Sequence, residues 1–561
     1  MSLLINALLN FVRFLRNVRR ALRRSPDFVW MPVTGALPEL KPSHRSRLSR
    51  RLDPRTLAPS LEDIRARLDR VLADGRVRGV ILRVENLDAG WAALEELRTE
   101  IDRCREQGKG VVAYLADGGD TRSYYLASAA DEIFASPLST LSVVGLRVRV
   151  NFLKDALGSL GLETEVIAVS PYKSAADPIS RTDFSKESRE QVERLLDRRF
   201  DALVTGISAG RDISPERVRS LIDNAPYSAA EAVEKRLIDG ALYEDELTCR
   251  LSSGDKPAKL VEWGEARKVL RVPYRRRTRK VVGLVGVEGT VVRGSSRKLP
   301  VPLPLLGREQ AGSDSVVAAL RVAEKQRRVA VVLLYVDSPG GDALASDLIW
   351  REVERIRAKK PVVVLMGNAA ASGGYYVSAP ASRIVARKNT ITGSIGVILT
   401  RPVASDLFGK LKVSAAAVGR GTRSNILDPR YRPTPDELAV LNDQLHVFYD
   451  GFKARVASGR KLHPEALEAL AGGRVWTGAE ALERDLVDEN GGYRIALARA
   501  RELAGIAEDA PGVLIKIAPP RGARPAPGEP VREAADAVSR AVSELLVARV
   551  WASAPYEISD D

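Results

Sequence analysis

Short apolar runs alternate along this chain with polar segments of helix length. Residues 331–336 (VVLLYV) and 362–366 (VVVLM) are two such runs, and the segment between them is long enough for a helix. Runs of Val and Leu bounded by turn residues are typical of buried strands, and two of them joined by a helix form a βαβ crossover. The pattern therefore predicts an α/β fold with its chemistry at the strand ends.

The same pattern occurs twice. The match runs without gaps from the pair Val111 and Val362 to the pair Gly145 and Gly396, and the two members of each pair are 251 positions apart. Self-similarity over such a length is the signature of a duplicated unit. We therefore expect two tandem copies of one α/β domain.

A chain of 561 residues is too long for a single hydrophobic core, so we expect several parts. They are a basic amphipathic helix (1–25), the first copy (26–270), a basic linker broken by proline (271–280), the second copy (281–505), and a Pro-rich spacer with a C-terminal helix (506–561). Within the second copy, residues 291–313 are rich in Pro and Gly and predict a long loop. The C-terminal helix is expected over 531–550 as an assembly or docking element.

Both apolar runs of the second copy end in glycine-rich turns. Residues 337–341 (DSPGG) follow the first run, and consecutive glycines can turn their N–H groups toward a ligand, as in an oxyanion hole. Ser372 follows the second run among small residues, at the expected start of a helix. Its hydroxyl would be open to a carbonyl there, and the helix dipole would favour negative charge. The alternative is a serine that only caps the helix.

The histidine and cysteine residues suggest neither a general base nor a metal site. The chain has His44, His446 and His463, and none of them follows a predicted strand, so a histidine base is not expected. Cys104 and Cys249 are the two cysteines, and they provide no metal-binding cluster. We therefore expect neither a metal nor a cofactor.

Three motifs together carry a family resemblance: DSPGG at 337–341, AAASGGYY at 369–376 and TGSIG at 392–396. In this order and spacing they resemble signal peptide peptidase A, a family of membrane-associated serine proteases. The resemblance implies an α/β architecture that is a tandem duplication of a ClpP/crotonase-like, βαβ-rich domain with flanking helices.

The resemblance also implies roles for single residues. Ser372 would be the nucleophile, and the N–H groups of Gly340, Gly341 and Gly373 would hold the oxyanion. Ser394 of the TGSIG motif would orient the general base.

The two copies differ at the positions that carry this chemistry. Thr121 of the first copy aligns with Ser372, and the first copy lacks the DSPGG turn, so we expect no second independent site. Lys173 of the first copy aligns with Ser424, 251 positions further on, so the second copy has no lysine at this position to serve as a base. In the duplicated form of the family, a lysine in such a Tyr-Lys-Ser-Ala string is the general base, which implies a Ser372–Lys173 dyad across the domain interface. The alternative for Lys173 is a surface lysine.

The net charge of +15 is unevenly distributed. Residues 1–60 contain twelve Arg or Lys and three acidic residues, which accounts for +9, and no nucleic-acid-binding motif accompanies this excess. In residues 1–24, apolar positions at helical spacing alternate with arginines, but the uncharged stretch ends at Val12, well short of the roughly 20 residues that span a bilayer. We expect this helix to lie on a membrane surface. The alternative is a helix used for assembly or packed on the protein's own surface.

The expected function is a serine endopeptidase that degrades released signal peptides and similar hydrophobic peptides. The resemblance further implies location at a bacterial-type inner membrane and a homotetramer enclosing a chamber, with no nucleic-acid partner. Two alternatives remain open, a crotonase-type acyl-CoA enzyme and a non-catalytic membrane scaffold of the same fold.

Overall fold

The computed structural model describes residues 2–41, 59–274, 278–303, 307–508, 510, 513–519 and 549–553. The chain forms two compact units, the first from Met1–Leu146 and Asp197–Arg277 and the second from Arg147–Leu196 and Thr278–Asp561. The segment Arg147–Leu196 thus joins the second unit, although the predicted repeat boundaries assign it to the first copy. His44 and residues 275–277 of the predicted linker lie outside the described residues.

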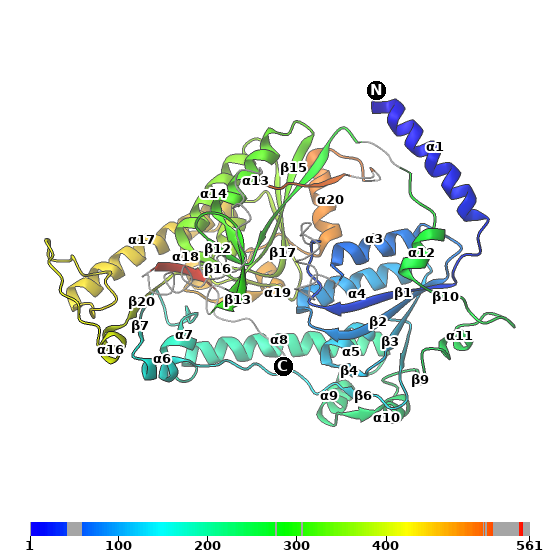
Figure 1. The fold of residues 1–561 in the computed structure, drawn as a ribbon, viewed down its shortest axis with the longest axis horizontal. Coiled ribbons are helices and arrows are strands. Elements are labelled where there is room, and N and C mark those ends of the chain that lie inside the picture. The colour runs from blue at the N-terminus through cyan, green and yellow to red at the C-terminus, as the bar shows by residue number, and fades with distance from the viewer. Residues whose placement is uncertain are drawn as a thin grey trace. The chain divides into compact units, whose positions relative to one another are not determined.

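The first unit is built around a parallel sheet with strand order β10-β1-β2-β3-β5-β9. Its strands are β1 (Phe28–Gly35), β2 (Gly79–Leu87), β3 (Gly110–Leu115), β5 (Glu132–Ala135), β9 (Gly240–Ala241) and β10 (Leu260–Glu262). The helices α3 (Leu61–Leu72) and α4 (Trp91–Glu106) connect β1 to β2 and β2 to β3, and they lie side by side in Figure 1. Their apolar faces are buried, as expected for helices that cover a parallel sheet.

The second unit repeats this order as β23-β11-β15-β17-β18-β22. These strands are β11 (Val281–Glu288), β15 (Val329–Ser338), β17 (Val362–Ala371), β18 (Arg383–Ala386), β22 (Glu489–Asn490) and β23 (Leu514–Lys516). The helix α14 (Ala343–Arg357) joins β15 to β17 and lies beside α13 (Ser313–Lys325) (Figure 1). The shared strand order confirms the predicted duplication and the predicted βαβ crossover.

Smaller pairings are also duplicated. In the second unit, β17 pairs with β19 (Ile391–Gly393), which pairs with β21 (Val475–Thr477). In the first unit, β4 (Gly119–Asp120), β6 (Thr140–Ser142) and β8 (Tyr227–Ser228) form the equivalent ladder. The end of β17 in the second copy and the strand β4, which follows β3 in the first copy, are therefore held by equivalent ladders.

The second unit contains another sheet, with strand order β13-β14-β12-β16-β24-β20-β7. Its strands are β7 (Glu163–Ala168), β12 (Thr290–Val292), β13 (Arg297–Leu303), β14 (Gly307–Gly312), β16 (Gly340–Asp342), β20 (Ile398–Val403) and β24 (Arg549–Ser553). Because β7 pairs with β20, the segment Arg147–Leu196 is tied to the second unit by main-chain hydrogen bonds.

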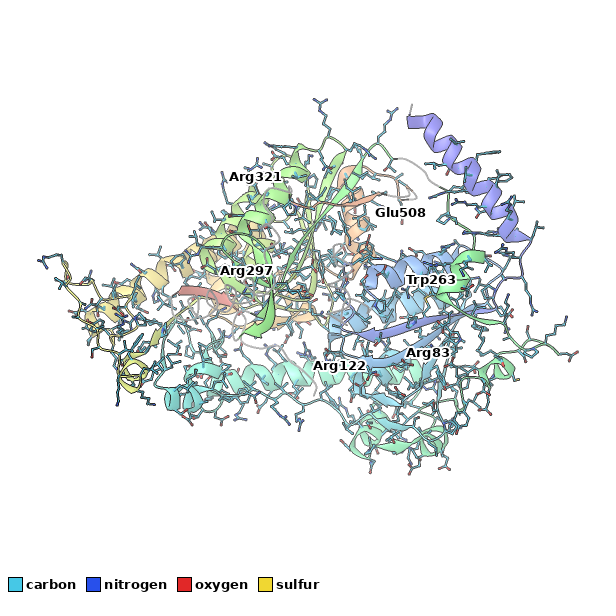
Figure 2. The ribbon with its side chains drawn as sticks, in the orientation of Figure 1. Arg83, Arg122, Trp263, Arg297, Arg321 and Glu508 are labelled. Atoms are coloured by element: carbon cyan, nitrogen blue, oxygen red, sulfur yellow. The ribbon has the colours of Figure 1, made fainter. Side chains whose placement is uncertain are left out.

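The predicted loop over 291–313 was wrong. Residues Arg297 and Gln310 face each other in an antiparallel ladder between β13 and β14, and Figure 2 labels Arg297 on this hairpin. Pro300 and Pro302, two of the prolines that suggested a loop, lie on β13, which is the edge strand of its sheet. Proline is tolerated there because an edge strand need not donate all its N–H groups.

A helix was predicted near each end of the chain, and the structure describes the first of these segments far more fully than the second. At the N-terminus, α1 (Ser2–Ala21) confirms the predicted helix, and no helix among the described residues has the length and apolarity needed to cross a bilayer. At the C-terminus, residues 531–548 of the predicted helix lie outside the described residues. Its last two positions, Arg549 and Val550, belong to the strand β24, so the predicted helix does not extend over them.

Candidate active site

Ser372 lies where β17 ends and α15 (Gly373–Ser378) begins. Its backbone has φ 52° and ψ −111°, a conformation that is strained for a residue with a side chain. Two hydrogen bonds hold it there: Ser372 N donates to Gly393 O at 2.7 Å, and Tyr376 N donates to Ser372 O at 2.7 Å. The hydroxyl makes no cap hydrogen bond to α15, which rules out the alternative of a serine that only caps the helix.

The side chain of Lys173 reaches this hydroxyl. Lys173 Nζ lies 2.6 Å from Ser372 Oγ and 2.9 Å from both the hydroxyl and the carbonyl oxygen of Ser394. Lys173 is 2% exposed, and Ser372 and Ser394 are fully buried. Lys173 is therefore not a surface lysine, and the structure brings the three residues together within the second unit.

The surroundings of Lys173 favour the neutral amine. Burial lowers the pKa of Lys173 well below its usual value, because removal from water penalises the ammonium form. A neutral amine has two N–H donors and one lone pair. The two oxygens of Ser394 can accept the N–H groups, which leaves the lone pair for the hydroxyl proton of Ser372. The arrangement can thus transfer a proton from a serine hydroxyl to a lysine amine.

Ser394 is held as firmly as Ser372. It has a φ of 51°, and its N–H donates to Arg474 O at 2.7 Å. Its hydroxyl and carbonyl therefore present two acceptors on one side of the Lys173 amine. This geometry is what a residue that orients a neutral amine requires, as the TGSIG motif suggested.

A glycine pair that the motif comparison did not single out lies against Lys173. A Cβ on Gly473 would be 2.7 Å from Lys173 Cα, and Gly473 has a φ of +89°. Gly472 O accepts a hydrogen bond from Ser170 Oγ, in the turn that leads to Lys173. Glycine is needed here for both its conformation and its lack of a side chain. The sequence signal was the pair Gly472-Gly473, which lies one residue before the strand β21.

The sequence patterns also did not single out Gln191. This buried residue is on α8 (Lys186–Arg211), and its amide group makes two hydrogen bonds. Gln191 Nε2 donates to Tyr172 O at 3.0 Å, and Gln191 Oε1 accepts from Val475 N at 3.0 Å. The amide therefore links the residue before Lys173 to the strand that follows Gly473. Nothing in the helical pattern distinguished this glutamine from a solvent-exposed one.

The predicted oxyanion donors lie beside the serine. Ser338 pairs with Ala370 on the neighbouring strand, and a Cβ on Gly374 would be 2.6 Å from Ser338 O, so the DSPGG turn closely approaches the start of α15. Gly373 is the first residue of α15, where N–H groups have no partner within the helix.

The two glycines of the turn have different constraints. Gly340 N donates to Ser338 Oγ at 3.2 Å, so it must leave this partner to bind an oxyanion. Gly341 cannot carry a side chain, because a Cβ would be 2.0 Å from Val291 O on β12. Both glycines also have positive φ values, which explains why the turn needs this residue type.

The first unit has a different group at the equivalent position. Thr121 Oγ1 donates to Gly145 O at 3.0 Å, which matches the contact of Ser372 Oγ with Gly396 O at 3.4 Å. Ser424, which aligns with Lys173, is exposed. The hydroxyl of Thr121 thus keeps a structural hydrogen bond of the repeat.

Comparison with known proteins agrees with the duplication. The family model described as Peptidase family S49 matches residues 103–256 and 354–507, one match in each copy. A second model, described as Clp protease, matches residues 307–392. A ClpP1 mutant from Listeria monocytogenes aligns with 38% of this chain and 94% of its own at 14% identity and a TM-score of 0.24, so the ClpP-like fold is assigned from the family models.

Similar full-length relatives exist in plants and bacteria. The chain is 32% identical over 460 residues to "Serine protease SPPA, chloroplastic" of Arabidopsis thaliana, covering 81% of this chain and 67% of the relative. It is 32% identical over 459 residues to "Protease 4" of Haemophilus influenzae, covering 78% and 72%. For "Protease 4" of Salmonella typhi the identity is 29% over 463 residues, covering 79% and 72%.

Two matches to one peptidase family, two copies of a ClpP-like α/β domain and relatives aligned over most of the chain give the same assignment. The chain belongs to peptidase family S49 and is a serine peptidase of the duplicated, long-form signal peptide peptidase A type.

Proposed function

We propose that this protein is a membrane-associated endopeptidase that degrades released signal peptides and similar hydrophobic peptides. Ser372 is its nucleophile and Lys173 its general base. The observation that supports this most strongly is the distance of 2.6 Å between the buried Lys173 amine and the Ser372 hydroxyl. The substrate class is proposed from the resemblance to the signal peptide peptidase A family.

In the proposed reaction, Lys173 accepts the hydroxyl proton while Ser372 Oγ attacks the peptide carbonyl. N–H groups of Gly340, Gly341 and Gly373 stabilise the tetrahedral oxyanion. The C–N bond then breaks, and the Lys173 ammonium gives its proton to the leaving amine. Lys173 next removes a proton from water, which hydrolyses the acyl-enzyme and restores the serine.

Burial makes the Lys173 amine available as a base. Lysine has a pKa near 10.4 in water, and burial lowers the pKa of Lys173 well below that value, which favours the neutral amine. Ser394 acts as a positioning residue, because its two oxygens hold the amine with its lone pair toward Ser372.

The test is hydrolysis of a fluorogenic apolar peptide by the full-length protein. Ser372→Ala and Lys173→Met should each lower kcat/KM by at least about a thousandfold, because each removes one member of the reacting pair. The exposed Lys154 offers the matched control, and Lys154→Met should keep wild-type activity. Retained hydrolysis in Ser372→Ala would contradict the proposal and favour a crotonase-type enzyme. A wild type without hydrolysis would favour the non-catalytic scaffold.

Membrane association is proposed from α1. Its polar side is tied to the first unit: Arg13, Asn17 and Arg20 donate to backbone carbonyls at Pro273, Val272 and Leu270, respectively. The large apolar side chains of this segment are exposed, by 44–84%, at Leu8, Phe11, Phe14, Leu15, Val18 and Leu22. An exposed apolar face with nearby arginines favours an anionic bilayer surface. The proposed location is a bacterial-type inner membrane.

Sedimentation with anionic vesicles tests this part. The double variant Phe11→Glu, Leu15→Glu should lose most vesicle binding and keep peptidase activity on a soluble peptide. Leu138, which is 94% exposed elsewhere in the first unit, provides the control Leu138→Glu. Equal binding by both variants would exclude α1 as the membrane contact.

The proposed assembly is a homotetramer. It rests on the family resemblance and on apolar side chains exposed near one another in the sequence of the second unit, at Leu411, Val413 and Val418. Light scattering should give four times the chain mass of 61.1 kDa. Val418→Asp should shift the mass toward the single chain if this segment contributes to the contact.

A further inference from the structure

The side chain of Tyr449 meets the glycine turn that lies against Lys173. Tyr449 is on α17 (Pro435–Arg460), and its ring is buried in the core of the second unit. Its hydroxyl oxygen accepts a hydrogen bond from Gly472 N at 3.0 Å, and the hydroxyl donates to Glu468 Oε1 at 3.2 Å. A hydroxyl that donates to a carboxylate keeps its lone pairs for other donors. The arrangement therefore suits the N–H group of the turn.

The turn connects this hydroxyl to the lysine. Gly472 O accepts a hydrogen bond from Ser170 Oγ, three residues before Lys173. Gly473 N donates to Ile395 O at 2.8 Å, and a Cβ on Gly473 would be 2.7 Å from Lys173 Cα. One short turn thus joins the tyrosine hydroxyl to the segment that carries the amine and to the TGSIG motif.

The charges around the hydroxyl keep it in one state. Glu468 Oε2 lies 2.8 Å from Lys453 Nζ, and Lys453 Nζ lies 4.3 Å from the centre of the Tyr449 ring. Burial, and after it the charge of Glu468, raises the pKa of Tyr449, so the hydroxyl keeps its proton. Tyr449 is therefore a neutral hydrogen-bonding link and not an ionising group of the site.

Equivalent positions in this part of the two copies can be identified from the structure. The helices α8 and α17 both have 26 residues, and the arginine that ends each helix is ion-paired with an aspartate. These pairs are Arg211–Asp239 and Arg460–Asp488, whose matching members are 249 positions apart. The spacing is the same for Ser228 and Thr477, which begin equivalent capping boxes. The alignment therefore runs without gaps over these elements.

The first copy differs at each position of the link. Phe200 occupies the position of Tyr449. Arg219 corresponds to Glu468, and its guanidinium lies 5.1 Å from the centre of the Phe200 ring. The exposed pair Asp223-Asn224 occupies the positions of the two glycines. A phenylalanine ring is thus sufficient to fill this place in the fold, and the hydroxyl occurs in the copy whose turn contacts a lysine.

We propose that Tyr449 is a positioning residue for the Ser372–Lys173 pair, and that its hydroxyl acts by holding the turn Gly472-Gly473 against the lysine. The inference rests on the proposed function, because it takes Lys173 as the general base. The turn packs against the backbone of the lysine, so a looser turn would let the amine move from the serine hydroxyl and would admit water beside it. The alternative is a tyrosine that only fills the core, as Phe200 does.

The first test compares Tyr449→Phe with wild type in the full-length protein. A β-lactone probe acylates Ser372, and the rate should rise with pH as the Lys173 amine loses its proton. In Tyr449→Phe the midpoint of this profile should move upward by about half a pH unit or more, because water favours the ammonium. The rate at about pH 7 should then fall by at least about threefold. With the fluorogenic peptide, kcat should fall and KM should stay near its wild-type value.

Tyr227→Phe is the matched control. Tyr227 is 5% exposed and Tyr449 is 6% exposed, and the Tyr227 hydroxyl also makes a buried hydrogen bond, to Leu221 O at 2.8 Å in the first unit. Both variants should lose similar stability, but Tyr227→Phe should keep the wild-type profile. Equal profiles in the two variants would overturn the inference. A wild-type rate without pH dependence would instead contradict Lys173 as the base, and the role of Tyr449 with it.

Amide hydrogen exchange tests the link itself without catalysis. The amides of Gly472 and Gly473 should exchange at least about tenfold faster in Tyr449→Phe than in wild type, because Gly472 N loses its acceptor. Tyr227→Phe should leave their exchange unchanged. Unchanged exchange in Tyr449→Phe would show that the turn is held without the hydroxyl and would overturn the inference, even where Ser372-dependent hydrolysis persists.

Discussion

The amine of Lys173 is surrounded by three oxygens of serine residues, at distances of 2.6 to 2.9 Å. Burial alone lowers the pKa of Lys173, and no carboxylate contributes to the shift. A carboxylate in contact would favour the ammonium and raise the pKa. The two hydroxyls and the backbone carbonyl of these serines form hydrogen bonds with the amine without adding charge. They are therefore compatible with a neutral base.

This environment predicts a pH-dependent stability. At pH values between the lowered pKa of Lys173 and about 10.4, the unfolded chain carries a proton on this lysine and the folded chain does not. The free energy of unfolding should therefore rise with pH across that interval, by up to about 1.4 kcal/mol per pH unit from this group. In urea unfolding at about pH 8 and pH 10, Lys173→Met should show a smaller increase than wild type. The same increase in both proteins would mean that Lys173 is protonated when folded.

Gly473 should control where the amine sits. Gly473→Ala places a methyl group against Lys173, at a φ of +89°, and should lower kcat by about tenfold or more. A displaced amine is better solvated, so the midpoint of the kcat pH profile should also move upward. Gly421 has nearly the same φ, +90°, with open space around it. The variant Gly421→Ala reproduces the backbone strain alone, and an equal effect there would remove the specific role of Gly473.

At the scale of elements, the first part of α8 holds the lysine segment in place. Gln191 links Tyr172 O to Val475 N, and the side chain of Arg194 contacts Glu480 and the backbone carbonyl of Val475. Tyr172, Gln191 and Arg194 all belong to the segment Arg147–Leu196 of the second unit. This segment therefore brings the amine of Lys173, which is the proposed base, and the residues that support it to the strands that carry Ser372.

Removal of this link should affect catalysis more than folding. Gln191→Leu leaves the buried N–H of Val475 without its partner, at a cost of about 1–3 kcal/mol, and also removes the donor to the partly buried carbonyl of Tyr172. We expect kcat to fall with little change in KM, and its pH midpoint to move upward, because the lysine becomes less constrained. Glu193 is exposed on the same helix, so Glu193→Leu is the control. A loss of stability without a kinetic effect would assign Gln191 a purely structural role.

For the whole molecule, duplication does not duplicate the site. The units share the order of their main sheets, yet Ser372 is replaced by Thr121 and Lys173 by Ser424 at the equivalent positions. Each copy thus lacks one of the two proposed reacting groups. Within the second unit, the segment Arg147–Leu196 supplies the amine that the second copy lacks.

One reactive serine per chain follows from this division. A serine-directed acylating probe should label the full-length protein at one equivalent per chain, and Ser372→Ala should not be labelled. Thr121→Ser should still give one equivalent, because a hydroxyl at that position donates to Gly145 O and has no lysine assigned to it. Mass spectrometry of the intact chain measures the count. Two equivalents in Thr121→Ser would show that the first copy can activate a nucleophile.

Residue patterns alone predicted the duplicated parallel sheets and the glycine turns, and the family resemblance added the roles proposed for Ser372, Lys173 and Ser394, which the structure places together. Buried strands and tight turns leave local signals, since apolar runs and glycines reflect the immediate surroundings of each residue. The family resemblance singled out the lysine, and the comparison of the two copies agreed with it, because the second copy has Ser424 where the first has Lys173. The prolines of 291–313 misled the prediction, because edge position on a sheet is not a local property.

Other features of the fold and of the candidate site were decided by tertiary packing. It determined that Arg147–Leu196 joins the second unit, that Gly473 and Gln191 hold Lys173, and that β24 pairs with strands at the active site. These contacts join segments far apart in the chain, and each depends on shape and hydrogen-bonding partners that no short pattern encodes. The low pKa of Lys173 belongs to the same class, because burial is a property of the folded chain and not of the lysine itself.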